Sequence, residues 1–292
     1  MVGSPTKRAR FTVAYDGAPF HGFAQSAGVP TVLGALREAI ELVVREPVEL
    51  FGAGRTDAGV HAWGQVVSVD LPESVDLGAL ADRLNRLCGP AISVRTAEWA
   101  TDPSFHARFS ARSRCYRYHV LNDAHPNPFL AATTWHVREP LDLWAMRLGC
   151  DPLIGEHDFT SFCRRPKDAR PAPDVSVDPA VVSHADRGNP GRHVTRRAGS
   201  EGPASLVRRV LDATWAVVEH EQAERLLRFE IRANAFCHQM VRSIVGTLVD
   251  VGRGRLPAGD VLAILRARDR RVAGQVAPPH GLTLWHVAYE GE

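Results

Sequence analysis

The order of the predicted strands and helices in the N-terminal part of the chain constrains the fold more than any other feature. Short runs of alternating apolar and polar residues are typical of strands, and apolar residues that recur at helical spacing are typical of amphipathic helices. These patterns predict strand, helix, strand, strand, helix and strand in turn. In that order, the expected elements are residues 11–15, 32–43, 48–50, 66–71, 77–88 and 92–95. This βαββαβ order is that of a ferredoxin-like arrangement, in which two helices cover one face of an antiparallel sheet.

Both predicted helices begin after a residue that can cap them. Thr31 precedes the first helix and Asp76 precedes the second. A side-chain oxygen at such a position accepts a hydrogen bond from an unpaired N–H of the first helical turn. The two starts are therefore expected at Val32 and Leu77.

A second set of elements follows from about residue 110. Strands are expected at 115–121, 206–218, 226–233 and 282–289, and helices at 141–148, 237–251 and 260–266. From the element order alone, we predict a second, elaborated ferredoxin-like half. The chain is thus expected to be an α+β protein with two domains, residues 1–109 and residues 110–292.

One segment of the second half has no periodic pattern. Residues 164–209 contain six prolines and ten Arg or Lys against five Asp or Glu. Such composition predicts a long, mobile, basic insertion. Two interpretations stay open: a solvated loop without a role, or a flexible arm that contacts phosphate groups.

Composition sets limits on the class of protein. The chain has 292 residues, of which 45% are hydrophobic and 23% are charged, as in soluble globular proteins. Its net charge of +2 does not by itself predict a nucleic-acid-binding protein, although most of the 35 basic residues are arginines, which suit phosphates and bases. Five cysteines without a C-x-x-C pair predict neither a disulfide framework nor a zinc site, so we expect a reduced chain. No leader-like or membrane-length apolar run is found, and we expect a cytoplasmic protein with no membrane segment.

The glycine-rich stretch 52–63, G-A-G-R-T-D-A-G-V-H-A-W, lies between two of the predicted strands. Its glycines surround Arg55 and Asp57, so it predicts a tight loop that displays a carboxylate. The alternative is a hairpin with an ordinary surface Asp–Arg pair. A dinucleotide or phosphate loop is disfavoured because the G-x-G-x-x-G spacing and a following Gly-Lys-Ser/Thr are absent, and a strand follows instead of a helix.

Residues 54–62 of this loop, G-R-T-D-A-G-V-H-A, resemble the signature loop of the tRNA pseudouridine synthase A family. Further motifs fall in the family's order: A-Y-D-G at 14–17, F-H-A-R-F-S-A at 105–111, Y-R-Y at 116–118, N-A-F-x-H-Q-M-V-R-x-I-V-G-T-L at 234–248 and H-G-L-x-L at 280–284. The resemblance spans residues 10–289. It departs at residues 22–25, where Gly-Phe-Ala-Gln replaces the family's usual Gly-Trp-Gln-x-Gln, so no RNA contact is assigned to that loop. The 164–209 segment is longer than is typical of the family, and no role is transferred to it.

The resemblance implies a tRNA-modifying isomerase that converts uridine to pseudouridine at tRNA positions 38, 39 and 40, in the anticodon stem-loop. It detaches uracil from the ribose at the C1′–N1 bond and reattaches it through C5. The resemblance also implies one extended, mostly antiparallel sheet made by two ferredoxin-like halves, with a central catalytic cleft between them. A homodimer that binds tRNA is implied, and neither a cofactor nor a metal is.

The family's functional residues transfer to four positions of this chain. Asp57 corresponds to the catalytic aspartate, which serves as a nucleophile or as a base acting on the sugar. Arg242 is expected to form an ion pair with Asp57 that keeps the carboxylate ionised. Tyr116 is expected against the flipped-out uracil, where an aromatic ring offsets lost base stacking. Arg55 is expected to assist base extrusion or to hold a phosphate.

Simpler interpretations of these residues remain. Arg242 can be an arginine at a helix edge, Tyr116 a core aromatic and Arg55 a plain partner of Asp57. His61 is expected to be structural, because it closes a tight turn. A thiol catalyst at Cys237 is rejected, because the residue falls at the start of the apolar face of the predicted 237–251 helix.

Two other classes of function compete with the isomerase. A non-catalytic RNA-binding protein is disfavoured because the aromatic RNP1 pattern is absent. A small-molecule hydrolase is disfavoured because no second carboxylate is placed to pair with Asp57 and no Ser–His arrangement is evident.

Overall fold

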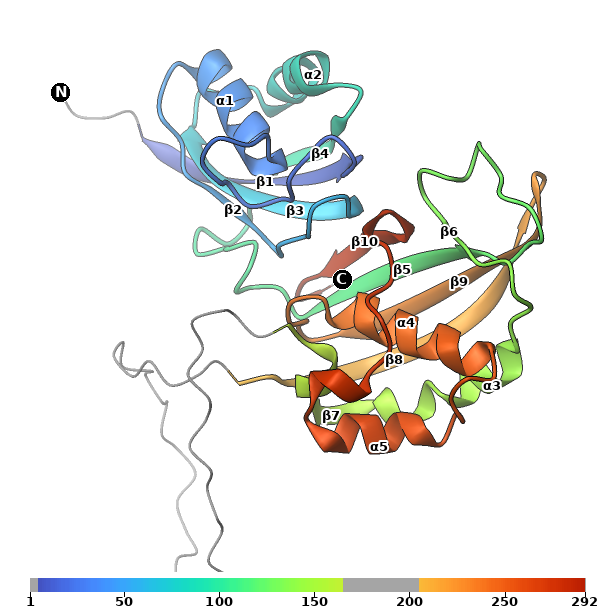
Figure 1. Cartoon of the computed structure of the whole chain (residues 1–292). Helices are drawn as coiled ribbons and strands as arrows, with labels where there is room; N and C mark the ends of the chain where they lie inside the picture. Colours follow the sequence, from blue (N-terminus) through green and yellow to red (C-terminus); the bar gives the residue numbers. More distant parts are fainter. Residues whose placement is uncertain (1–4, 165–204, 292) are drawn as a thin grey trace, which may run out of the picture.

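The computed structural model describes residues 5–164 and 205–291 as a mixed α+β molecule built on one large sheet (Figure 1). The strands are β1 Thr6–Tyr15, β2 Leu50–Gly52, β3 His61–Pro72, β4 Ile92–Trp99, β5 Ser113–Leu121, β6 Trp135–His136, β7 Gly155–Asp158, β8 Val207–His220, β9 Ala223–Ala233 and β10 Leu282–Ala288. The helices are α1 Val32–Val44, α2 Leu77–Cys88, α3 Leu143–Leu148, α4 Met240–Gly252 and α5 Asp260–Ala267. Short 3₁₀ turns lie at Asp151–Leu153, Thr160–Phe162, Arg270–Val272 and Pro279–Gly281.

The strand order in the sheet is β4-β1-β3-β10-β5-β9-β8-β7, with β2 paired to β3 and β6 paired to β5. Neighbouring strands are antiparallel, except for the parallel pairs β3–β10 and β5–β6. The sheet is therefore mostly antiparallel, as predicted. Strands β1–β4 form one side of it and β5–β10 the other, and the two sides meet where β3 pairs with β10.

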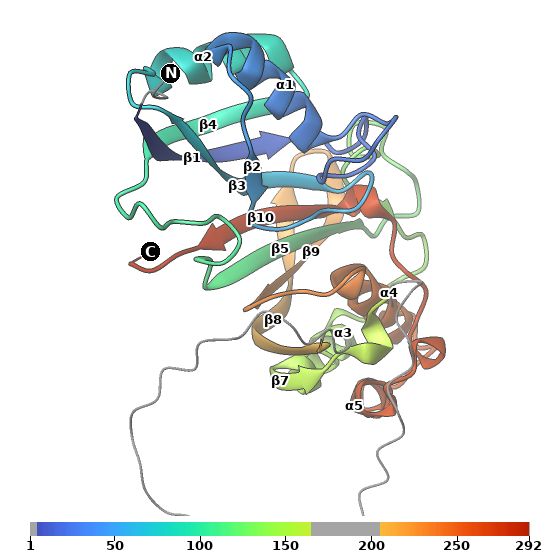
Figure 2. The same cartoon turned by 90° about the vertical axis from the view of Figure 1, so that its left-hand side faces the viewer.

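The boundary where β3 pairs with β10 is called the seam below. The strand register across it places two tyrosines on the same face of the sheet. Tyr15 pairs with Ala62 of β3, which pairs with Leu284 of β10. Leu284 in turn pairs with Tyr116 of β5. Directly paired residues point to the same side of a sheet. In Figures 1 and 2, α1 and α2 lie over the N-terminal strands, and α3, α4 and α5 over the C-terminal ones.

The predicted helix starts at Thr31 and Asp76 are confirmed. The hydroxyl of Thr31 accepts a hydrogen bond from the Gly34 N–H, and the carboxylate of Asp76 accepts from the N–H groups of Gly78 and Ala79. The start of α4 was predicted at Cys237 and is wrong, since α4 begins at Met240. Gln239 adopts a left-handed conformation with φ of 63°, which a continuous helix does not contain.

The expectation of a chain without disulfides is also wrong. Cys163 and Cys237 form a disulfide, with their Cα atoms 5.8 Å apart. The two cysteines are 74 residues apart in the sequence, so no local spacing revealed the pair. Cys88, Cys115 and Cys150 are free thiols.

The predicted insertion at 164–209 lies almost entirely outside the described residues. Where the description resumes, β8 already begins at Val207, so the predicted segment extends about three residues too far. Within the described residues, no helix is long and apolar enough to cross a membrane.

Candidate active site

The glycine-rich loop runs between β2 and β3, as predicted, and its glycines serve different purposes. A Cβ on Gly52 would lie 2.2 Å from the ring of Phe23, so this position needs a residue without a side chain. Gly59 has a φ of +76°, which favours glycine. Gly54 has neither constraint, since the nearest atom to a Cβ there is the Tyr116 hydroxyl at 4.0 Å. Phe23 is 2% exposed, so it packs under the loop and does not face solvent.

Three hydrogen bonds from buried residues hold the backbone around Asp57. The N–H of Phe23 donates to the carbonyl of Thr56 at 3.1 Å. The hydroxyls of Tyr15 and Thr56 are 2.8 Å apart. The fully buried Gln65 donates from its side-chain amide to the carbonyl of Gly54 at 2.9 Å. These bonds fix the part of the loop that immediately precedes Asp57.

Two cationic or ionisable side chains from one segment contact the two oxygens of Asp57. Nη1 of Arg242 lies 3.0 Å from Oδ2, which is the ion pair predicted from the sequence. Nε2 of His238 lies 3.3 Å from Oδ1. The side chain of Asp57 is 25% exposed, so the carboxylate is accessible although both its oxygens are contacted.

Arg242 is itself fixed in place. It lies in the first turn of α4, its side chain is 13% exposed, and its Nε donates to the carbonyl of Ala277 at 2.7 Å. The N–H of Ala277 donates back to the carbonyl of Arg242 at 3.1 Å. A guanidinium can make both contacts at once because its donors form a rigid fork.

Tyr116 lies on β5 beside this group and is 8% exposed. Its ring packs edge-on against Phe236, with centroids 5.0 Å apart. Burial raises the pKa of the Tyr116 hydroxyl, and the nearby Tyr15 and Asp57 raise it further. The hydroxyl therefore stays protonated at neutral pH.

Arg55 and His61 occupy very different positions. Arg55 is exposed, and among the described residues its side chain has no hydrogen bond or ion pair, so it is not the partner of Asp57. His61 is 7% exposed, and its Nδ1 lies 3.1 Å from both the Gly17 nitrogen and Asp16 Oδ1. His61 holds the turn after β1, which agrees with the structural role expected for it.

Two residues of this site were missed in the sequence. His238 was passed over because the segment was expected to be helical. Arg114 is the other: its guanidinium donates to the carbonyls of Ala53, Arg108 and Asn234. It thus connects the start of the Asp57 loop with the segment that leads to His238. No motif distinguished it from the other arginines.

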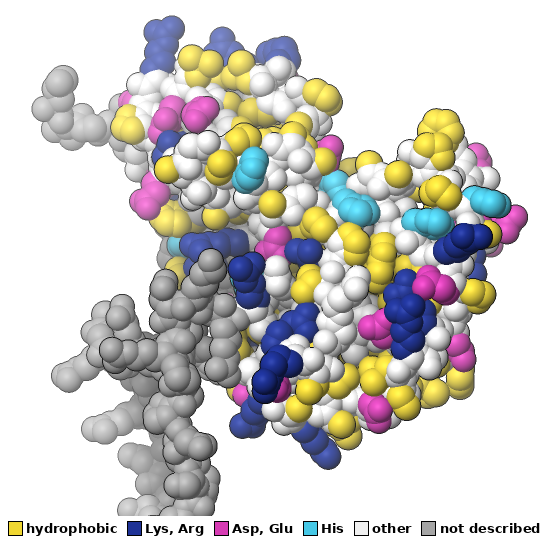
Figure 3. Space-filling view, viewed as in Figure 1, with side chains coloured by type: hydrophobic (Ala, Val, Ile, Leu, Met, Phe, Trp, Pro, Cys, Tyr) yellow, Lys and Arg dark blue, Asp and Glu magenta, His cyan; other side chains and the backbone are white. Residues whose placement is uncertain are grey.

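Basic side chains gather on one face of the molecule. Figure 3, in the same view as Figure 1, shows Lys and Arg side chains gathered below the part of the molecule formed by α1, α2 and β1–β4. Such a surface favours the approach of a polyanion.

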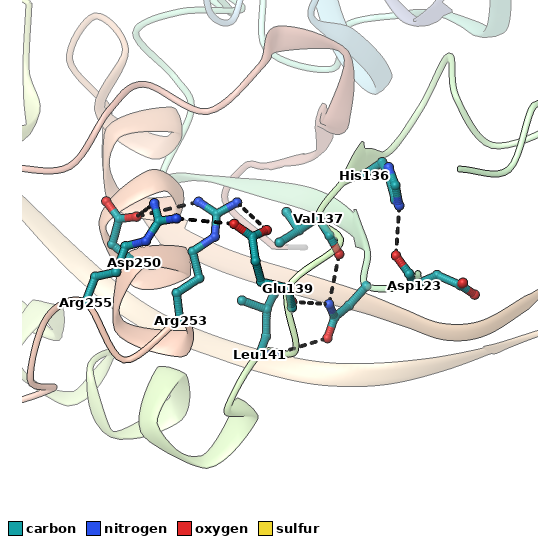
Figure 4. Close-up of polar contacts among 9 residues, drawn as sticks. Asp123, His136, Val137, Glu139, Leu141, Asp250, Arg253 and Arg255 are labelled. Carbon is teal, nitrogen blue, oxygen red and sulfur yellow. Dashed lines mark hydrogen bonds and ion pairs between the residues drawn. The ribbon is translucent and has the colours of Figure 1, made fainter. Parts of the chain in front are cut away.

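A second cluster of polar contacts, drawn in Figure 4, is structural. Glu139 pairs with Arg253 and Arg255 beyond the end of α4, and both arginines also approach Asp250. The side-chain amide of Asn122 donates to the carbonyls of Val137 and Glu139, and its oxygen accepts from the N–H of Leu141. The cluster ties the segment after β6 to α4, and the charges of Glu139, Asp250, Arg253 and Arg255 pair with one another. Among the described residues, no group of His, Cys, Asp and Glu has the arrangement of a metal site.

Comparisons with known proteins identify the family of the chain. A family model described as tRNA pseudouridine synthase matches residues 190–290. Curated relatives named tRNA pseudouridine synthase A include one from Caulobacter sp. (strain K31), 38% identical and covering 98% of this chain and 99% of its own length. Another, from Bacillus velezensis, is 36% identical over 97% of this chain and 99% of its own, and one from Frankia casuarinae is 39% identical over 97% and 89%.

Among solved structures, a crystal structure of a Cbf5-Nop10-Gar1 complex matches 83% of this chain and 45% of its own chain. At 13% identity and a TM-score of 0.29, that likeness is too weak to define the fold. The curated relatives, however, match nearly end to end. The chain belongs to the tRNA pseudouridine synthase A family of isomerases.

Proposed function

We propose that this protein isomerises uridine to pseudouridine at positions 38, 39 and 40 of the tRNA anticodon stem-loop. The observation that carries the proposal is the Asp57 carboxylate, partly exposed on the signature loop and paired with Arg242 at 3.0 Å. The family membership supplies the reaction, and this pair supplies the group that the reaction needs.

The reaction breaks the C1′–N1 bond and forms a C1′–C5 bond. The proton on C5 is released, N1 takes up a proton, and no electrons are gained or lost. Asp57 is the catalytic residue, acting as a nucleophile or as a base on the sugar. Arg242 is the ion-pair partner of this carboxylate and holds its Oδ2 oxygen in place.

Tyr116 and Arg55 are proposed to bind the substrate. The ring of Tyr116 forms the floor of the base site, with its protonated hydroxyl near C5 of the uracil. Arg55 is exposed and unpaired among the described residues, which leaves it available for a phosphate or for the space vacated by the flipped base. Base stacking on such a ring is worth about 1–3 kcal/mol.

The proposed architecture is two ferredoxin-like halves, residues 1–109 and 110–292. Its support is the strand order, β4-β1-β3-β2 in the first half and β10-β5-β9-β8 in the second. In both halves the strands are ordered fourth, first, third, second, counting the second half as β5, β8, β9 and β10, and the neighbours are antiparallel. Asp57 comes from the first half and Arg242 from the second, so the proposed cleft lies between them.

The protein is also proposed to act as a cytoplasmic homodimer on tRNA. A chain of 32.0 kDa would then sediment at twice that mass. A protein that sediments with the mass of one chain without tRNA, and binds tRNA as a single chain, would argue against the dimer.

The experiment that tests the function is tritium release from anticodon stem-loops labelled at uridine C5. Three transcripts each carry a single uridine, at position 38, 39 or 40. Release from all three is expected, and release from one or two would narrow the substrate range. Binding of every transcript without release from any would favour the rival, a non-catalytic RNA-binding protein.

A further inference from the structure

His238 is the second side chain on Asp57, and no role has been assigned to it. Its Nε2 lies 3.3 Å from Oδ1, while Arg242 Nη1 lies 3.0 Å from Oδ2. The two oxygens of one carboxylate are therefore contacted from different sides. A carboxylate held by Arg242 alone could still turn about its Cβ–Cγ bond, whereas one held at both oxygens has a single orientation.

The backbone of His238 is held in place independently of Asp57. The preceding residue, Cys237, is joined by its disulfide to Cys163. The N–H of Arg164 donates to the carbonyl of His238 at 2.9 Å. The following residue, Gln239, takes the left-handed conformation that precedes α4. Fixed main chain on both sides directs the imidazole toward the loop.

The position of His238 also fits a role at the mouth of the site. Its side chain is 49% exposed, whereas that of Arg242 is 13% exposed. A half-exposed histidine has no packing reason to lie against a carboxylate. It is also reachable by a small molecule from solvent, which makes its role open to chemical rescue.

We propose that His238 is a positioning residue that orients the Asp57 carboxylate for attack by donating a hydrogen bond to Oδ1. This inference rests on the proposed function of Asp57. Arg242 then holds Oδ2 of the carboxylate, and His238 sets its rotation by holding Oδ1. Misplacement of a reacting group by about 1 Å can cost on the order of 10²-fold in rate.

The test compares His238→Ala and His238→Gln under single-turnover conditions with saturating tRNA. The alanine variant is expected to release tritium about 10- to 100-fold more slowly, with an unchanged dissociation constant for tRNA. The glutamine variant is expected to retain most of the rate, because its amide nitrogen can occupy the place of Nε2. Added imidazole is expected to restore part of the rate of His238→Ala.

A matched control is His286→Ala, an exposed histidine that lines a cavity on the opposite face of the sheet. It should release tritium at the wild-type rate. A His238→Ala protein with wild-type turnover overturns the proposal, as does one whose only defect is weaker tRNA binding. If His238→Ala does not fold, a His238→Gln protein that folds but has lost about 100-fold in rate, with no rescue by imidazole, overturns it equally.

Failure of the proposed function has a different signature. A wild-type protein that releases no tritium refutes the function before any variant is compared. The contact is then judged by a crystal structure of the wild-type protein. Nε2 of His238 within hydrogen-bond distance of Asp57 Oδ1 would then support only that His238 holds the carboxylate, and a separated pair would refute that as well.

Discussion

At the scale of single residues, the proposed reaction depends on how the Asp57 carboxylate is held. Asp57 lies on a loop whose backbone is bonded to buried side chains, and it meets a guanidinium that is bonded to a backbone carbonyl. Asp57 and Arg242 are therefore already in contact before a substrate binds. Such preorganisation avoids reorganisation cost during the reaction.

The double contact of Arg242 leads to a prediction for Arg242→Lys. A lysine keeps the charge but has one nitrogen, which cannot serve both Asp57 and the Ala277 carbonyl. We expect tritium release to fall about 10²-fold, in line with a misplaced catalytic group. The melting temperature should change by only a few degrees.

The control is Arg253→Lys, beyond the other end of α4, where the guanidinium pairs with Glu139. That variant should keep the wild-type rate. Equal rates for Arg242→Lys and the wild-type protein would show that the fork geometry at Asp57 is unimportant.

The residues of the site differed in how far the sequence could predict them. Asp57 and Arg242 carry recognisable motifs, and their contact followed from opposite charge. His238 could not be placed, because the turn that directs it depends on a disulfide between distant cysteines and on a left-handed Gln239. Arg114 was equally hidden, since its partners are backbone carbonyls.

At the scale of elements, α4 is the helix on which the site depends. It is buried along most of its length, and the segment 275–277 crosses it closely. A Cβ on Gly246 would lie 1.8 Å from the carbonyl oxygen of Gln275. Only glycine permits this approach, and the crossing segment carries the Ala277 carbonyl that holds Arg242.

We therefore expect Gly246→Ala to destabilise the protein by about 1–3 kcal/mol, as overpacking does. Intrinsic helix propensity alone would predict the opposite, a gain of up to about 1 kcal/mol. Urea unfolding measures the difference, and tritium release should fall with it, because Arg242 loses its support.

Gly259→Ala is the matched control. A Cβ there meets no atom within 4 Å, and the backbone has an ordinary φ of −62°. It should be neutral or slightly stabilising. A Gly246→Ala protein as stable as Gly259→Ala would contradict the packing described for α4.

Most elements could be predicted because they are long enough to show a period. The ten residues of β1 and the thirteen of α1 each display their buried face. Strands β6 and β7, with two and four residues, were missed. Elements so short form because a neighbouring strand pairs with them, β5 with β6 and β8 with β7, and they are too short to show a period of their own.

At the scale of the whole molecule, the site exists only while the two sides of the sheet stay together. They pair directly through two residue pairs, His61 with Thr283 and Ala62 with Leu284. A stack of side chains reinforces this seam on the face opposite Tyr116. Trp63 and Trp285 stack at 5.9 Å, with Arg95 over the first ring at 3.8 Å and Arg117 over the second at 3.9 Å.

Removing one ring of this stack should loosen the seam. Trp63 is 45% exposed, so we expect Trp63→Ala to cost about 1–3 kcal/mol, less than the loss of a fully buried tryptophan. The rate of tritium release should fall as well, because Asp57 and Arg242 lie on opposite sides of the seam. Trp144→Ala on α3, where the ring is 69% exposed, should change neither stability nor rate. If Trp63→Ala and Trp144→Ala had equal effects, the two sides of the sheet would be held together by backbone pairing alone.

Long-range pairing is the part of the fold that the sequence pattern could not define. Alternation predicts that β3 and β10 are strands, but not that they are partners. Parallel pairing of strands from two halves is determined by the whole set of buried faces, which meet only in the folded chain.

The most direct test of the account is tritium release by Asp57→Asn, compared with the wild-type protein on the same labelled stem-loops. The substitution nearly preserves shape but removes the charge that Arg242 and His238 hold. Loss of at least about 10³-fold in rate is expected, as when a catalytic group is removed, with tRNA binding retained. The control Asp70→Asn, on an exposed pair with Arg8, should keep the wild-type rate. Wild-type release by Asp57→Asn would contradict the central claim that this carboxylate carries the reaction.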